Sequence, residues 1–392
     1  MTDTFACLYC GYPYPTEQST LEHAIPQSLG GALAPDRFKL HNVCKKCNND
    51  LGAYVDASFA KSWFVTNGLA TAAHKLYASV DDAPLPLTCM GPIDFADLAV
   101  PEGCLAELWL GPSGESMFWL RPKDEMLYWY SGGNPRHRAE PSTVYWFPTS
   151  ADPTRLKIGS DSLFSAFKKR KNARKVMGVA CHGFPGNGYP PGFDVPDGTD
   201  MANVVAIQAQ MEGFHCRVPF NLQFDTRFIC KLALGVGYSL FGDAFASTEN
   251  AKELRKGCWP KNQTQIGVRG VPMFGSKDPV LERFMGYPGA VVLVVTSTID
   301  GFVLMMTIDE GKPFIVGLAP ASLCSSAVTP EGYALLLFPS IRRCVEMTFV
   351  ELVGHHDRSW PHRSLAEIDV QLARSAKFWS TLARLPTRSS ES

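Results

Sequence analysis

The 392-residue chain lacks several features that would assign it to a class at once. Its formal net charge is only −1 at pH 7, so it is not a generic polycation, and contact with nucleic acid would need local basic patches. The longest apolar stretches, such as Ala290–Thr296, are far too short to span a bilayer. The N-terminus has no basic region followed by an apolar stretch. We therefore expect a cytoplasmic protein with no membrane partner.

The composition is that of ordinary globular protein. Hydrophobic residues make up 45% of the chain and charged residues 19%, which is enough apolar material for sizeable cores. The length favours two or three compact units over one. Of the twelve cysteines, four form two pairs near the N-terminus. The other eight are scattered singly, and in a cytoplasmic chain we expect them to be reduced thiols in the core.

Hydrophobic periodicity predicts a mixed fold in which helices and strands occur in separate blocks. Helices are expected after Cys47 as far as Trp63, and then at Leu69–Leu76, Ser162–Met177, Phe224–Trp259 and Leu365–Leu382. Strands are expected at 117–121, 126–130 and 144–147, and again at 290–297, 302–308, 313–318, 333–338 and 345–352. The segment Gly183–Gly198 is rich in glycine and proline, which is typical of a linker or a long loop. The predicted class is α+β, with antiparallel strands in the larger part of the chain.

Two Cys-x-x-Cys pairs, Cys7 with Cys10 and Cys44 with Cys47, lie within the first fifty residues. Thiolates bind zinc tetrahedrally, and a two-residue gap lets both sulfurs of one turn face the same ion. Two such pairs in one domain are a strong signal for a structural Zn²⁺. The cysteines alone would favour a zinc ribbon that only folds the domain.

The segment between the two pairs contains Leu21-Glu22-His23-Ala24-Ile25-Pro26-Gln27-Ser28-Leu29-Gly30-Gly31, and Asn42-Val-Cys-Lys-Lys-Cys-Asn48 follows. Over roughly residues 5–60 the combination resembles the HNH endonuclease family, which implies a zinc-braced ββα-metal fold. The resemblance implies that Glu22 is the acidic ligand of a catalytic ion, that His23 is the general base, and that Asn48 is the closing ligand. It places Asn42 near the middle asparagine of the family.

Two departures from the family pattern concern the acidic ligand and the middle asparagine. Glu22 replaces the commoner aspartate. The spacing from Asn42 to Asn48 is shorter than in many members of the family, so Asn49, Asp50 or His41 are alternatives for the role of Asn42. The chemistry nevertheless suits these residue types. A neutral histidine accepts a proton from water near pH 7, and Mg²⁺ or Mn²⁺ prefers carboxylate and amide oxygens. We therefore predict Mg²⁺ or Mn²⁺ as the catalytic ion beside the structural zinc.

Candidate contacts to nucleic acid are clusters of cations. The run Lys168–Lys175 has six cations in eight residues and could neutralise several phosphates, although a solvated helix face explains it equally well. The full set of candidates is Arg37, Lys45, Lys46, Lys168, Lys169, Arg170, Lys171, Arg174 and Lys175. The aromatic strands around Trp119 and Trp146 could stack bases, but packing in the core is the expected use. We expect an exposed turn, in preference to a metal site, at His355, His356 and His362.

We therefore predict an HNH nuclease domain at residues 1–75 and an α+β targeting or regulatory body at 76–392, with a further division near 183–200 as an option. The predicted function is a metal-dependent DNA endonuclease that hydrolyses phosphodiester bonds, with restriction or phage defence as a role by analogy. One alternative is a non-catalytic, zinc-containing nucleic-acid-binding protein. Another is a nuclease effector gated by a ligand-sensing C-terminal body. DNA is the predicted partner, and a homo-oligomer or a protein or small-molecule regulator stays open.

Overall fold

The computed structural model describes residues 4–94, 98–124, 132–133, 135–178, 191–210, 215–218, 222–259, 270–271, 283–311, 313–323 and 327–384. The chain forms two compact units, each assembled from segments far apart in the sequence. Unit 1 comprises Met1–Ala60 and Asn221–Leu372, and unit 2 comprises Lys61–Phe220 and Ala373–Ser392. This division differs from the predicted boundaries at 75 and near 183–200, and residues 183–190 lie outside the described part. The assignment of residues 1–75 to a nuclease domain and 76–392 to a targeting or regulatory body stays a prediction.

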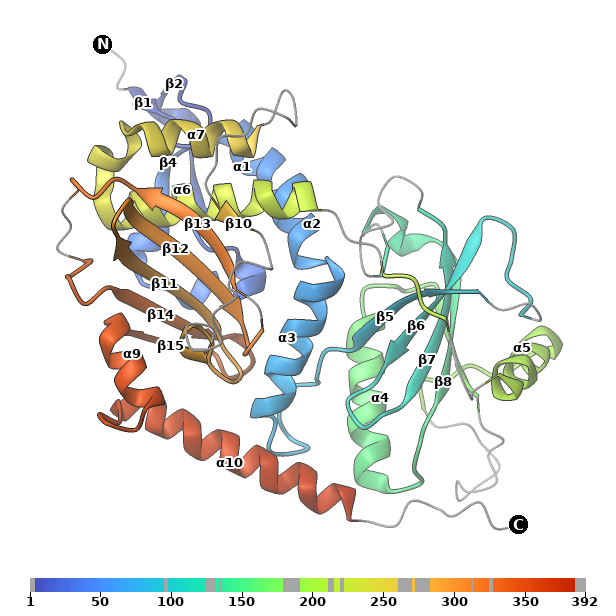
Figure 1. Ribbon diagram of the computed structural model, residues 1–392. Helices are drawn as coiled ribbons and strands as arrows, with labels where there is room; N and C mark the ends of the chain where they lie inside the picture. Colours follow the sequence, from blue (N-terminus) through green and yellow to red (C-terminus); the bar gives the residue numbers. More distant parts are fainter. Residues whose placement is uncertain are drawn as a thin grey trace. The chain divides into compact units, whose positions relative to one another are not determined.

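The N-terminal part of unit 1 consists of short strands, turns and helices (Figure 1). In chain order these are β1 (Thr4–Ala6), β2 (Pro13–Pro15), η1 (Thr16–Gln18), β3 (Ser19–His23), η2 (Gln27–Leu29), η3 (Gly31–Leu33), η4 (Asp36–Phe38), β4 (Lys39–Cys44), α1 (Lys45–Leu51), η5 (Gly52–Asp56) and α2 (Ala57–Ala60). Strands β3 and β4 pair antiparallel, and α1 follows β4 directly. The predicted ββα order is therefore confirmed. The predicted helix beyond Cys47 forms in pieces, because the turn η5 is π-helical.

The rest of unit 1 is built on an antiparallel sheet with strand order β10-β13-β12-β11-β14-β15. Its elements are α6 (Leu222–Ala246), α7 (Glu249–Cys258), β10 (Gly270–Val271), β11 (Val291–Thr298), β12 (Gly301–Ile308), β13 (Phe314–Ala319), β14 (Tyr333–Phe338), η7 (Pro339–Ile341), β15 (Arg343–Met347), α9 (Phe349–His356) and the first part of α10 (Arg363–Ala383). The strand predicted at 345–352 is wrong beyond Met347. A capping box between Thr348 and Glu351 starts α9 there instead.

Helix α6 joins the N-terminal elements to this sheet. It is long and apolar enough to cross a membrane over Gln223–Ala246, but 72% of its most apolar window is buried inside the protein, as in a core helix. The ring of Phe228 on α6 stacks on Phe59 with centroids 3.6 Å apart. Two turns further along, Gly235 lets the chain after β3 approach, because a Cβ there would lie 2.8 Å from the Cβ of Ala24. The N-terminal elements and α6 therefore share one core.

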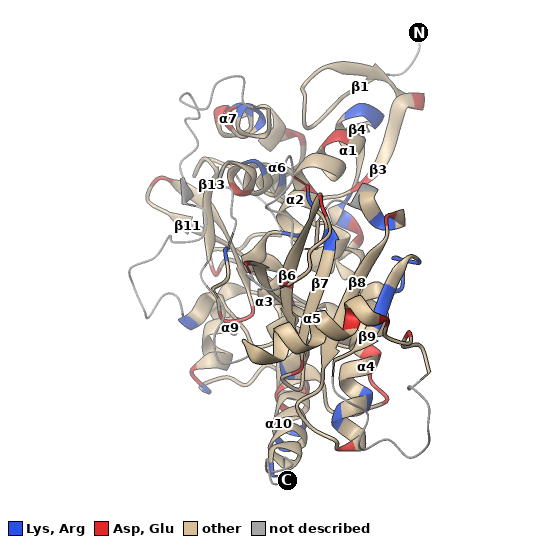
Figure 2. Ribbon diagram, turned by 90° about the vertical axis from the view of Figure 1, so that its right-hand side faces the viewer, with Lys and Arg blue, Asp and Glu red and all other residues tan. Residues whose placement is uncertain are grey.

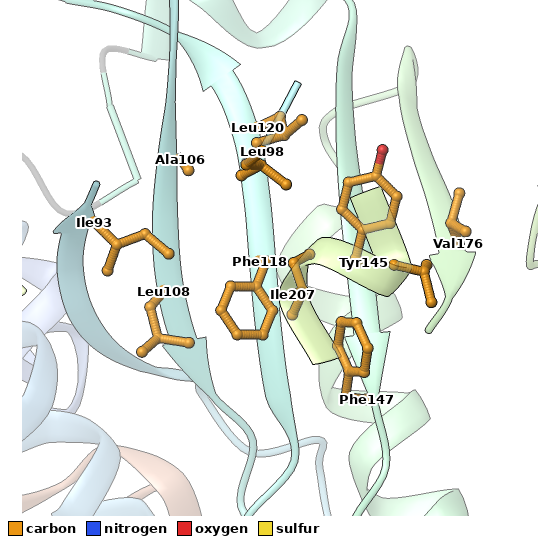
Figure 3. Packing of buried hydrophobic residues seen from close by; sticks show 11 residues of the cluster. Ile93, Leu98, Ala106, Leu108, Phe118, Leu120, Tyr145, Phe147, Val176 and Ile207 are labelled. Atoms are coloured by element: carbon orange, nitrogen blue, oxygen red, sulfur yellow. The ribbon is translucent and has the colours of Figure 1, made fainter. Parts of the chain in front are cut away.

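Unit 2 contains a five-stranded sheet with order β5-β6-β7-β8-β9, in which only the β8–β9 pair is parallel. Its elements are α3 (Trp63–Leu76), β5 (Thr88–Ile93), β6 (Cys104–Leu110), β7 (Ser116–Pro122), η6 (Pro135–Ala139), β8 (Ser142–Phe147), α4 (Pro153–Phe167), β9 (Ala173–Met177), α5 (Gly198–Ala209) and the end of α10. Alternate residues of β7 enter two cores. Phe118 packs with Ile207 of α5 (Figure 3), whereas Trp119 packs with Phe167 of α4.

The helix predicted over Ser162–Met177 is wrong in its second half. Helix α4 ends at Phe167, and Ala173–Met177 forms β9. Residues 168–172 carry no apolar side chain that could keep a helix packed on the core, whereas Val176 is fully buried and β9 pairs with β8. Tertiary pairing thus outweighs local helix propensity here. The strand predicted at 126–130 lies outside the described residues.

Candidate metal and catalytic sites

The two cysteine pairs converge on one point. The four Sγ atoms of Cys7, Cys10, Cys44 and Cys47 lie within 4.8 Å of one another, and this is the one metal-binding group found among the described residues. The backbone N–H of Cys44 donates to Cys7 Sγ, and that of Cys47 donates to Cys44 Sγ, each at 3.4 Å. A hydrogen bond from Cys47 lowers the pKa of Cys7 to about 5. The donor set and its compactness fit a tetrahedral Zn²⁺ bound to thiolates.

Other elements of unit 1 hold the Cys7–Cys10 turn in place. Asn42 accepts a hydrogen bond from the Leu8 N–H through its backbone oxygen at 2.9 Å, which ties the turn to β4. Arg255 Nε, at the end of α7, donates to the Leu8 carbonyl at 2.7 Å. Trp259 Nε1, which follows α7, donates to the Tyr9 carbonyl at 3.2 Å. The Cys7–Cys10 turn is therefore part of the core of unit 1.

His23 ends strand β3, opposite Lys39 of β4. Its side chain is half-buried, and no hydrogen bond or ion pair engages its imidazole within the described part of the chain. On α1, Asn48 donates through Nδ2 to Thr20 Oγ1 at 3.1 Å and to the Leu21 carbonyl at 3.0 Å. These bonds orient the amide so that Oδ1 is its remaining polar atom. The structure thus brings α1 against the end of β3, as a ββα site requires.

Glu22 has a partner that sequence reasoning missed. Its carboxylate is buried, and its Oε1 lies 2.7 Å from the Nζ of Lys231, which belongs to α6. The Tyr9 hydroxyl donates to the same oxygen at 3.5 Å. Lys231 also pairs with Asp56 at 2.5 Å, and its side chain is only 1% exposed. No sequence signal points to Lys231, because the apolar periodicity of α6 predicts core packing and not a charged partner.

Lys231 does not contact every oxygen of the two carboxylates beside it. Burial raises the pKa of Asp56 to about 6 even though Lys231 lies beside it. Its Oδ1 is buried and has no hydrogen-bond partner in the described structure. Lys231 and Tyr9 both contact Oε1 of Glu22, so Oε2 is the oxygen that neither of them contacts. The oxygens Glu22 Oε2 and Asn48 Oδ1 are donors of the type that Mg²⁺ or Mn²⁺ prefers, so the residues fit such an ion chemically.

Asn42, the remaining family-motif residue, has a different environment. Its backbone oxygen binds Leu8, and its side-chain Oδ1 is buried without a hydrogen-bond partner among the residues described. Of its alternatives, His41 and Asn49 are exposed, and Asp50 pairs with Lys46 at 2.7 Å. The assignment of Asn42 to the catalytic set stays a prediction.

The candidate cations are divided between surface and internal roles. Arg37 pairs with Glu346 and donates to Tyr333, and Arg174 pairs with Asp197 and Asp200, so both are engaged within the fold. Lys175 donates to a backbone carbonyl on its own strand. The exposed members are Lys45, Lys46, Lys168, Lys169 and Lys171. Figure 2 shows the cations before and within β9 as blue ribbon. Binding of nucleic acid by any of them stays a prediction.

The C-terminal histidines belong to a hydrogen-bonded network. His355 Nε2 lies 3.3 Å from both Asp369 and the hydroxyl of Tyr287, and its Nδ1 accepts a hydrogen bond from the backbone of His362 at 3.1 Å. His355, Tyr287 and Asp369 line a cavity in unit 1 together with His356. They do not form a metal-binding group within the part of the chain that the structure describes.

Comparison with known proteins supports the resemblance of the N-terminal segment to the HNH endonuclease family. A model of the HNH endonuclease family matches residues 7–64, which include both cysteine pairs, the β3–β4 hairpin and α1. No curated protein and no solved structure matches the chain. The N-terminal segment 7–64 is therefore an HNH endonuclease domain that carries a four-cysteine cluster.

Proposed function

We propose that the protein is a metal-dependent DNA endonuclease that hydrolyses phosphodiester bonds. The proposed active site lies at the end of β3. The main support is the position of His23 at the edge of an HNH-type ββα unit, where its half-buried imidazole has no partner among the described residues. Asn48 supports the same assignment, because its two hydrogen bonds to β3 hold α1 against that strand. A cytoplasmic role in restriction or phage defence is part of the proposal by analogy with the family alone.

In the proposed reaction, a neutral imidazole of His23 removes a proton from a water molecule as that water attacks phosphorus. The new P–O bond forms as the bond to the leaving oxygen breaks, and the leaving oxygen takes a proton from solvent. Glu22 and Asn48 would hold the divalent ion, which supplies stabilisation of the negative charge that develops on the phosphate. Lys231 orients the buried carboxylate of Glu22 through its ion pair.

The test is cleavage of supercoiled plasmid by the full-length protein with and without added Mg²⁺ or Mn²⁺. We expect His23→Ala to lose cleavage at unchanged zinc content. A matched control is His137→Ala, which removes an imidazole from unit 2. Cleavage by the His23→Ala variant at the wild-type rate would contradict the assignment of the base. Plasmid binding without cleavage by the wild-type protein would favour the non-catalytic alternative.

A second candidate function is a nuclease whose activity is gated by the rest of unit 1. The observation that favours it is the Lys231–Glu22 ion pair, because α6 places a cation on the proposed acidic ligand. If Lys231 blocks the ion, Lys231→Met raises the cleavage rate at low Mg²⁺ concentration. If Lys231 orients Glu22, the same variant lowers the rate at every Mg²⁺ concentration.

A further inference from the structure

Unit 2 contains a cavity of about 440 Å³ on the side of its sheet where α4 ends. Its walls combine two kinds of side chain. The apolar part includes Trp109, Trp119 and Phe167. The cationic part consists of Lys61, Arg138, Lys168, Lys169 and Arg170. A cavity of this size is in the usual range for small-molecule sites, which are mostly apolar with a few placed polar groups.

Cations outnumber acids in the lining of this cavity. No acidic residue is found among the described residues that line it. The buried carboxylate of Glu107 interacts electrostatically with Arg170, but it is already bound by Arg121 with distances of 3.1 and 3.2 Å. Burial, followed by repulsion from Arg138 and Arg170, lowers the pKa of Lys61 to about 8. In a chain of net charge −1, such a concentration of cations indicates a site for an anion.

The cation at the base of the cavity is held in a fixed position. Arg170 Nη2 donates to the Gly132 carbonyl at 2.5 Å, and its guanidinium lies 4.2 Å from the ring centroid of Trp119. Burial and the neighbouring Arg121 lower the pKa of Arg170 to about 10. Lys168 and Lys169 are exposed and form no ion pair with any residue that the structure describes. A phosphate placed here would meet one fixed guanidinium and two adaptable ammonium groups.

The apolar wall offers a surface for a planar group. Trp109 is half-buried, and its indole N–H donates to Glu107 Oε2 at 3.0 Å, which fixes the orientation of the ring. Trp119 is buried between Arg170 and Phe167, so it supports the cavity from behind. Trp109 is therefore the ring on which a base could stack.

We propose that this cavity binds a nucleotide, with its phosphate at Lys168, Lys169 and Arg170 and its base against Trp109. The ligand is either a free mononucleotide or one nucleotide of a single strand, because both present the same phosphate and base. The site lies in unit 2 and does not depend on the proposed nuclease activity.

The experiment is calorimetric titration of the full-length protein without added divalent ions. The probes are the common ribonucleoside and deoxyribonucleoside monophosphates, a short mixed-sequence single-stranded oligonucleotide, and inorganic phosphate. We expect at least one nucleotide probe to bind more than about fivefold tighter than inorganic phosphate, because base stacking adds to the phosphate contacts. Trp109→Leu should remove that difference. If the oligonucleotide binds tighter than every monophosphate, the ligand is a nucleotide of a single-stranded nucleic acid. If a monophosphate binds tighter than the oligonucleotide, the ligand is a free nucleotide.

The charge requirement is tested with surface variants that leave the core intact. The double variant Lys168→Ala and Lys169→Ala should weaken nucleotide binding about tenfold or more, because it removes two charge-assisted contacts. Lys171→Ala is the matched control, since Lys171 is exposed in the same run but does not line the cavity. The proposal is overturned if no nucleotide probe binds at millimolar concentration, if inorganic phosphate binds as tightly as the nucleotides, or if the control weakens binding as much as the double variant.

Discussion

Replacing Lys231 by methionine tests whether α6 and the HNH domain form one electrostatic unit. The ammonium of Lys231 lies 2.7 Å from Glu22 and 2.5 Å from Asp56, and its side chain is 1% exposed. Methionine keeps most of the side-chain volume but leaves two buried carboxylates without a cation. Removing one partner of a buried ion pair typically costs about 3–5 kcal/mol, so we expect the free energy of unfolding to fall by that amount at pH 7.

The loss should depend on pH in a direction that Asp56 sets. Burial already raises the pKa of Asp56 to about 6, above its ordinary value of 3.8, and removal of Lys231 raises it further. A protonated Asp56 is neutral, so it loses no ion-pair energy when Lys231 is removed. The difference between Lys231→Met and wild type should therefore shrink as the pH falls from neutral toward about 6, and it should change little below that pH, where Asp56 is protonated in both proteins.

The assay is equilibrium urea denaturation of the zinc-loaded full-length protein, with hydrogen exchange of peptides from β3 and α6 to localise the effect. The matched control is Lys252→Met, which removes an exposed cation that pairs with Glu249 on α7 of the same unit. We expect the control to change stability by about 1 kcal/mol or less. Adding Glu22→Gln and Asp56→Asn to Lys231→Met should recover part of the loss. Equal effects of Lys231→Met and Lys252→Met, or no recovery, would refute the reasoning.

Two further predictions concern the metal and the pH dependence of stability. Cys44→Ser should release the bound zinc, as measured by elemental analysis, and lower the unfolding midpoint, whereas Cys344→Ser, outside the four-thiol cluster, should retain the metal. Burial raises the pKa of Asp225 to about 6 from 3.8, so its ionisation destabilises the folded state as the pH rises from about 4 to about 6. Asp225→Asn should therefore stabilise the protein by up to about 3 kcal/mol at pH 7 and by little at pH 4. A gain that is the same at both pH values would contradict this cause.

Local features of the chain determined the N-terminal site. The two-residue gaps within the cysteine pairs bring each pair of sulfurs to one side of a turn, and a strand that ends at His23 requires only nearby residues. The helix that starts after Cys44 likewise follows from its own sequence, with the Cys44 sulfur accepting a hydrogen bond at the helix start. The strands, the helix and the cysteine pairs all lie within residues 4–51, so their spacing in the sequence is enough to predict them, whereas the contacts of Arg255 and Trp259 with the Cys7–Cys10 turn come from the tertiary structure.

The tertiary structure alone decided which charges are internal. The basic run at 168–175 is uniform in sequence, but the pairing of β9 with β8 directs Arg174 to Asp200, while Arg170 turns onto Trp119. In the same way, Lys231 meets an aspartate 175 residues away, because α6 packs beside the HNH domain. The periodicity of a helix predicts that one face is buried but not what covers it. Long-range packing therefore sets the environment of Glu22, whereas the sequence by itself predicted the four-cysteine cluster and the position of His23 at the end of its strand.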